Sequence, residues 1–94
     1  MSGQLSAERV TESIRAFLFD RYLFGYEENE LDNDASFMDN GVLDSMGILE
    51  LVTFVENTFG ITVTDADILP ENMDSVNRLE QFIRTKLKDA VYRG

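Results

Sequence analysis

The stretch GVLDSMGILELV, residues 41–52, places a serine between a glycine-containing turn and an apolar run. The apolar residues then recur with a helical period, which predicts a helix over residues 45–59. The positions of this stripe are Ile48, Val52, Val55 and Phe59. Asp44 or Ser45 can cap the start of the helix, and Gly60 can end it. Ser45 is therefore either a helix cap or a point at which a chemical group is attached.

The rest of the chain divides into three further helices and one long loop. Apolar residues have helical spacing over residues 6–24 and 75–91. A short helix is expected over residues 65–69, because TDAD has a capping-box pattern and the following proline discourages continuation. Residues 25–44 lack a regular period and are rich in Asp, Asn and Glu, which predicts a loop. The expected fold is all-α, a four-helix bundle with three main helices and one short helix, in a single domain over residues 1–94.

The composition narrows the chemistry that the chain could perform. It has no cysteine and no histidine. Disulfides, thiolate metal sites and a cysteine nucleophile are therefore excluded, and the commonest general base is missing. Ser45 has no histidine to activate it and lacks the flanking glycines of a nucleophile elbow, so serine catalysis is not expected. The chain is predicted not to be an enzyme.

The acidic segment DNDASFMDNGVLDS, residues 32–45, matches a calcium-binding loop only in part. Counted from Asp32, the position that requires glycine holds Phe37, and the position that requires glutamate holds Leu43. No metal site is therefore predicted. An ion-binding protein, or an enzyme that works with carboxylates alone, remains an alternative hypothesis for the function of the chain.

The charge distribution bears on the kind of partner. The net charge is −10, and no lysine or arginine occurs from Tyr22 to Asn77. A nucleic-acid partner is not expected, because binding to phosphates needs a basic surface. An acidic surface instead favours encounter with a basic patch on another protein. No apolar run is long enough for a membrane span or a signal peptide, so we expect a cytoplasmic protein. We also expect it to be a monomer.

The block FMDNGVLDSMGILELVTFVENTFGITV, residues 37–63, resembles the core of the acyl carrier protein superfamily. In that family an apolar-Asp-Ser-Leu/Met signature opens the second helix. Leu43, Asp44, Ser45 and Met46 match the signature here. The later stretches FGITV, DAD and DSVNRLEQFI also match the family in order, so the resemblance covers nearly the whole chain.

The resemblance implies that Ser45 receives a 4′-phosphopantetheine arm from coenzyme A, with Asp44 as a flanking residue of the signature. The thiol of the arm would carry an acyl or aminoacyl group as a thioester. The implied partners are a phosphopantetheinyl transferase, an adenylating ligase or acyltransferase that loads the arm, and a downstream enzyme that accepts the acyl group. The candidate partner contacts are Met46, Leu49, Glu50 and Glu56. For the two apolar residues the alternative is core packing, and for the two glutamates it is simple solvation.

Two departures from the family pattern leave the cargo open. Gly47 stands where carriers of fatty-acid synthesis commonly have aspartate, and the expected helix 45–59 has only two acidic residues. LDSMG looks more like standalone carriers of amino acids, such as D-alanyl carriers. Gly47 could reflect either a close partner approach or tolerance of glycine in the first helical turn. The alternative function is an armless helical interaction module that uses an acidic surface to bind a basic partner.

Overall fold

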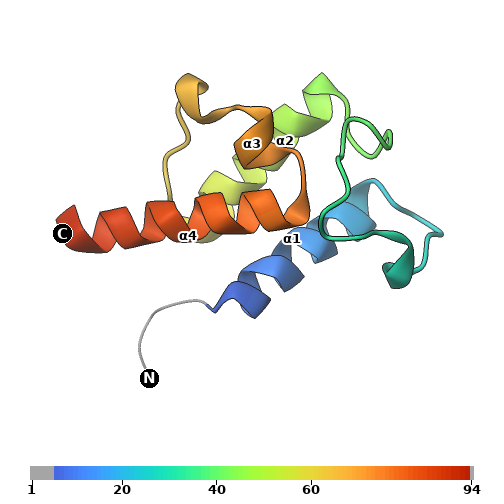
Figure 1. The fold of residues 1–94 in the computed structure, drawn as a ribbon, viewed down its shortest axis with the longest axis horizontal. Coiled ribbons are helices and arrows are strands. Elements are labelled where there is room, and N and C mark those ends of the chain that lie inside the picture. Colours follow the sequence, from blue (N-terminus) through green and yellow to red (C-terminus); the bar gives the residue numbers. More distant parts are fainter. Residues whose placement is uncertain (1–5, 94) are drawn as a thin grey trace.

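The computed structural model describes residues 6–93, with side chains described as far as residue 89. Its elements in chain order are α1 (Ala7–Arg21), the 3-10 turn η1 (Glu28–Glu30), α2 (Ser45–Phe59), the 3-10 turn η2 (Asp65–Asp67), α3 (Pro70–Met73) and α4 (Val76–Arg93). No strand occurs within residues 6–93. The prediction of an all-α fold with three longer helices and one short helix is therefore confirmed (Figure 1).

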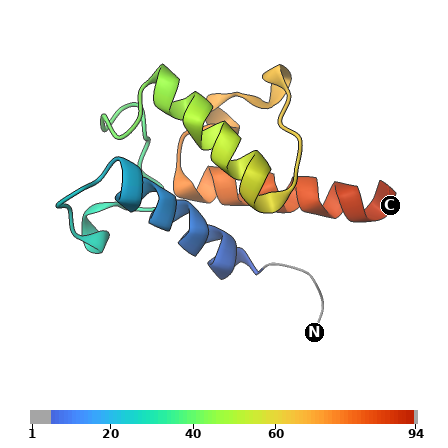
Figure 2. The ribbon, with the colours of Figure 1, turned by 180° about the vertical axis from the view of Figure 1, so that it is seen from behind.

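The helices are arranged around α4, which contacts α1, α2 and α3. Seen from behind, α1 and α2 run side by side in opposite directions (Figure 2). The rings of Phe17 in α1 and Phe54 in α2 stack with their centroids 4.3 Å apart, which joins these two helices directly. The long loop between α1 and α2 lies at the end of the bundle where α1 ends and α2 begins (Figures 1 and 2).

One cluster of buried apolar side chains forms the core. Its largest fully buried members are Val10, Ile14, Leu18, Phe37, Leu51, Val55, Val76, Leu79 and Ile83. Burial of each such side chain contributes about 1.5–3 kcal/mol to stability. Phe37 belongs to the long loop and not to a helix, so the loop that leads to α2 is itself anchored in the core.

The first helix is shorter than the sequence suggests. α1 ends at Arg21, before the predicted end at residue 24. The N–H groups of both Tyr22 and Leu23 donate to the carbonyl oxygen of Leu18, at 2.8 and 3.0 Å. The regular helical register stops when two donors share one carbonyl, so the apolar residues that follow belong to a turn.

The predicted short helix at residues 65–69 is corrected by the structure. The segment contains the 3-10 turn η2 (Asp65–Asp67), and a separate helix, α3, begins at Pro70. Proline is favoured at the first helical position, because its missing N–H has no partner there and its φ angle already suits a helix. The sequence interpretation treated this proline only as a stop signal.

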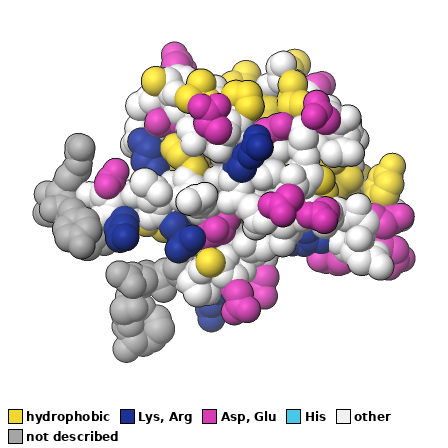
Figure 3. All heavy atoms as spheres, viewed as in Figure 1, with side chains coloured by type: hydrophobic (Ala, Val, Ile, Leu, Met, Phe, Trp, Pro, Cys, Tyr) yellow, Lys and Arg dark blue, Asp and Glu magenta, His cyan; other side chains and the backbone are white. Residues whose placement is uncertain are grey.

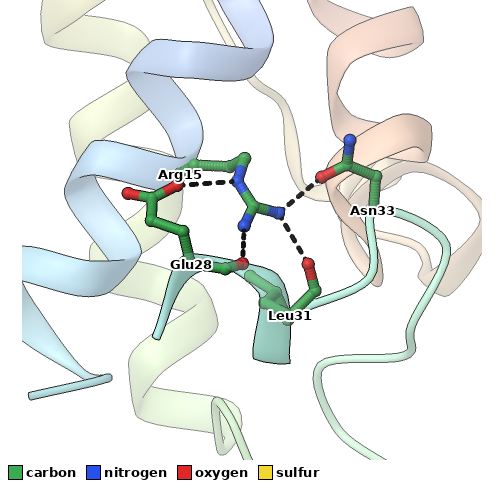
Figure 4. Close-up of polar contacts among 4 residues, drawn as sticks. All are labelled: Arg15, Glu28, Leu31 and Asn33. Carbon is green, nitrogen blue, oxygen red and sulfur yellow. Dashed lines mark hydrogen bonds and ion pairs between the residues drawn. The ribbon is translucent and has the colours of Figure 1, made fainter. Parts of the chain in front are cut away.

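The long loop is clamped to α1 by one side chain, Arg15 (Figure 4). Its Nη1 atom donates to the carbonyl oxygen of Leu31 at 2.8 Å and to Oδ1 of Asn33 at 2.7 Å. Its Nη2 atom donates to the carbonyl oxygen of Glu28, and its Nε atom lies 3.5 Å from the Glu28 carboxylate. A single guanidinium therefore fixes three successive points of the loop, using the donor geometry that is particular to arginine.

Candidate functional site

Ser45 is an exposed residue at the first position of α2. The residue before it, Asp44, caps the helix: its Oδ1 atom accepts a hydrogen bond from the N–H of Gly47 at 2.8 Å. The carbonyl oxygen of Asp44 also accepts from the N–H of Ile48 at 2.9 Å. The capping role that the sequence left open between two residues therefore belongs to Asp44, and the hydroxyl of Ser45 is not needed for it.

The position of Ser45 suits a phosphorylated group. The first turn of a helix presents backbone N–H groups without helical partners, and the positive end of the helix dipole lies there. Both features favour a phosphate at this end of a helix. Ser45 thus combines an exposed hydroxyl with an electrostatic environment that would stabilise a phosphate ester.

Gly47 is buried and packs against the end of the long loop. A Cβ atom at this position would lie 3.0 Å from Cδ2 of Leu43, 3.3 Å from its Cβ and 3.4 Å from Oδ1 of Asp44. The two separations from Leu43 are tighter than ordinary van der Waals contact. Internal packing of Leu43 on the helix explains the glycine, which sequence reasoning attributed to partner approach or to tolerance.

The two apolar candidates for partner contact lie on the outer face of α2. Met46 is 74% exposed and Leu49 is 58% exposed, so core packing does not account for either residue. They are three positions apart and therefore neighbours on the helix surface. Figure 3 shows hydrophobic side chains gathered on the face that includes α3 and the start of α2. Ser45 is thus flanked by exposed apolar surface.

The two acidic candidates each have a partner within the protein. Glu50 accepts a hydrogen bond from the hydroxyl of Tyr22, at the end of α1. Burial of Tyr22, together with this bond and the negative charge of Glu50, raises the pKa of the tyrosine to about 12. Oε2 of Glu56 accepts from the N–H of Val63 at 2.9 Å, in the segment that follows α2. Both glutamates therefore have structural roles that sequence reasoning missed.

An open hollow lies beside the start of α2, and its lining residues are Tyr22, Met38, Gly41, Val42, Leu43 and Asp44. Sequence reasoning did not associate Tyr22 with this region, because it precedes the loop and belongs to the predicted first helix. The sequence offered one signal that Tyr22 could lie near this region, namely an aromatic residue close to the expected end of the first helix. The hollow is formed where the end of α1 meets the segment before Ser45.

Within the described part of the chain, no group of three or more acidic residues is arranged to hold a metal ion. None of the helices described there is long and apolar enough to cross a membrane.

A family model described as phosphopantetheine attachment site matches residues 23–83. The chain belongs to this family. The matched region contains the whole of α2 and the loop that precedes it. Membership confirms the predicted relationship to acyl carrier proteins and assigns 4′-phosphopantetheine as the cofactor, and it supports a carrier role for the protein.

Similar proteins of this phosphopantetheine-attachment family are carriers by name. The acyl carrier protein of Thermotoga maritima is 27% identical over 82 residues, which are 87% of this chain and 96% of that protein. Aminoacyl carrier protein 1 of Bradyrhizobium diazoefficiens is 38% identical over 68 residues, 68% of this chain and 74% of that protein. The D-alanyl carrier protein of Streptococcus mutans is 39% identical over 57 residues, 61% of this chain and 71% of that protein.

Proposed function

We propose that the protein holds an acyl or aminoacyl group as a thioester on a 4′-phosphopantetheine arm attached to Ser45, and carries it between partner enzymes. The observation that supports this most directly is the exposed serine at the first position of α2, with the cap supplied by its neighbour Asp44. Ser45 also lies within the part of the chain that matches the phosphopantetheine attachment family.

Attachment of the arm requires an enzyme to activate the Ser45 hydroxyl. The serine oxygen forms a bond to the phosphorus of the pantetheine phosphate, and the bond from that phosphorus to the nucleotide part of coenzyme A breaks. The hydroxyl proton passes to a base of the phosphopantetheinyl transferase, since the chain has no histidine of its own. The contribution of the carrier is to present an exposed hydroxyl at a helix start where the phosphate is favoured.

An aminoacyl group is the cargo that we favour. The relatives named as aminoacyl and D-alanyl carriers are 38% identical over 68 residues and 39% identical over 57 residues, and the acyl carrier protein of Thermotoga maritima is 27% identical over a longer stretch of 82 residues. LDSMG also looks more like standalone carriers of amino acids. An amino acid would be loaded by an adenylating ligase and passed to a downstream acyl-accepting enzyme. A fatty acyl or polyketide group would instead require an acyltransferase or a condensing partner.

We infer that these enzymes contact α2 chiefly through Met46 and Leu49. Both side chains are largely exposed and both flank the attachment position. Glu50 and Glu56 contribute less in this proposal, because each carboxylate already accepts a hydrogen bond from the protein itself. An apolar pocket on the partner would therefore matter more for docking than a basic patch opposite α2.

Mass spectrometry of the intact protein tests the attachment. The unmodified protein is incubated with coenzyme A and a broad-specificity phosphopantetheinyl transferase. We expect a mass gain of one phosphopantetheine group on the wild type and on the control Ser13→Ala, and none on Ser45→Ala. The absence of a gain on the wild type would contradict the proposal and favour an armless interaction module. A gain on Ser45→Ala would instead contradict attachment at Ser45. The mass of the thioester on protein isolated from its native cells separates aminoacyl from fatty acyl cargo.

A further inference from the structure

The segment that leads into α2 is held at its base by the junction between α3 and α4. Asp74, the residue after α3, accepts a hydrogen bond from the hydroxyl of Ser36 on Oδ2 and one from the N–H of Met38 on Oδ1, at 3.0 Å. Its backbone carbonyl accepts a third bond from the N–H of Phe37, at 2.9 Å. Three successive residues of the loop are therefore fixed to one half-buried aspartate.

The three hydrogen bonds fix the position of residues 36–38 relative to Asp74. A carboxylate that accepts two hydrogen bonds, one on each oxygen, has its orientation determined by both donors. The Ser36 hydroxyl also accepts from the N–H of Asp39 at 3.0 Å, which extends the network further along the loop. Phe37 is fully buried, so its side chain and its backbone both anchor the same point. We name this arrangement, formed by Asp74 with residues 36–38, the loop anchor.

The loop anchor connects to the first turn of α2 through a short chain of contacts. The carbonyl oxygen of Phe37 accepts from the N–H of Val42 at 2.8 Å and from that of Leu43 at 3.3 Å. Leu43 in turn packs on Gly47, in the turn that begins with Ser45. Packing interactions and hydrogen bonds of this kind transmit a displacement, because protein interiors have little free space.

We propose that Asp74 is a positioning residue for Ser45: by anchoring residues 36–38 it holds the start of α2 in the orientation that the modifying enzyme recognises. The proposal rests on the proposed attachment of the arm to Ser45. Asp74 does not touch the transferred group in it and acts only through the loop. Loss of the anchor frees the segment that ends at Leu43 and allows the helix start to move relative to the bundle. A small displacement of a reacting group is costly for catalysis.

Steady-state kinetics of arm transfer test this role. The variants are Asp74→Ala, which removes both side-chain acceptors, and Asp74→Asn, which retains one. The control is Glu71→Ala, because Glu71 is an exposed carboxylate on α3. All are measured with the same transferase and coenzyme A, at a temperature at which circular dichroism shows each variant to be folded.

We expect kcat/KM for Asp74→Ala to fall about tenfold, Asp74→Asn to recover most of the loss, and Glu71→Ala to remain close to wild type. Amide hydrogen exchange at Phe37 and Leu43 should be faster in Asp74→Ala than in Glu71→Ala. If Asp74→Ala does not fold, Ser36→Ala, which removes one bond of the anchor, is expected to lower kcat/KM in the same way.

Two outcomes overturn the inference on its own. One is a folded Asp74→Ala variant modified with the kcat/KM of the wild type, and the other is an equal loss in Glu71→Ala. A purely structural role for Asp74 would lower the melting temperature and leave kcat/KM of the folded protein unchanged. If the wild type itself takes up no arm, the proposed function fails and this inference fails with it. If the wild type is modified normally and one of the two outcomes above is found, only the inference about Asp74 fails.

Discussion

Replacing Arg15 with alanine should destabilise the protein, because one guanidinium holds three points of the loop that leads to α2. The Arg15 side chain is only 15% exposed. Its bonds to the Leu31 carbonyl and to Asn33 are partly buried, at 2.8 and 2.7 Å. Its bond and ion pair with Glu28 lie near the surface, where the Glu28 side chain is 75% exposed.

The size of the loss follows from these two groups of contacts. A hydrogen bond from a charged donor contributes about 1.5–3 kcal/mol, and an exposed ion pair contributes about 0–1 kcal/mol. With two partly buried bonds lost and some recovery of hydration by the freed carbonyl, the free energy of unfolding should fall by ~3 kcal/mol. For a domain of this size, such a change lowers the melting temperature by roughly 12–24 °C.

Urea denaturation followed by far-ultraviolet circular dichroism measures this change. Arg9→Ala is the control, because Arg9 is an exposed arginine on the same helix and should alter the free energy of unfolding by less than about 0.5 kcal/mol. Arg15→Lys keeps the charge but loses the forked donor geometry, so it should fall between Arg15→Ala and the wild type. Equal losses in the free energy of unfolding for Arg15→Ala and Arg9→Ala would refute the conclusion that the Arg15 guanidinium holds the loop.

Two further predictions concern α2 and its contact with α1. The raised pKa of Tyr22, about 12, means that the unfolded chain loses this proton first, near pH 10. The free energy of unfolding should therefore fall as pH rises above about 10, and Tyr22→Phe should reduce that fall. Phenolate absorbance measures the pKa of Tyr22 and urea denaturation measures the free energy of unfolding; an unchanged pH dependence in Tyr22→Phe would show that folding does not raise this pKa. Leu49→Gln should raise the KM of the transferase for the carrier about tenfold with little change in stability. The control Thr53→Ala, on the same exposed face, should leave this KM unchanged, and an unchanged KM in Leu49→Gln would show that Leu49 is not part of the docking surface.

The bounds of α2 could be read from the sequence because all of their determinants are local. Asp44 provides the cap from the adjacent position, the apolar period defines the buried face, and Gly60 adopts a left-handed conformation with φ of 68° that ends the helix. The same holds for the candidate attachment residue, which was identified from a signature of neighbouring residues.

The roles of the two acidic residues of α2 could not be read from the sequence, because distant residues determine them. Glu50 is engaged by Tyr22, which precedes the whole loop, and Glu56 is engaged by a backbone N–H beyond the helix end. A sequence pattern identifies a carboxylate on an exposed helix face but not the donor that approaches it. The sequence therefore offered both glutamates as partner contacts, whereas in the structure each accepts a hydrogen bond from the protein itself. The large apolar side chains that α2 exposes are Met46 and Leu49.

The proposed carrier function makes two different demands on the molecule. Installation of the arm would need Ser45 in a fixed position, because the transferase would have to align a hydroxyl with a phosphate ester. Delivery of the cargo would need a longer reach, because several enzymes would have to meet the same thioester. Arg15 fixes the loop before α2 from α1, and Asp74 fixes it from the junction between α3 and α4, so the folded chain supports the first requirement. In the proposed function the second requirement is left to the arm, so the domain would not need to change its fold to serve several partners.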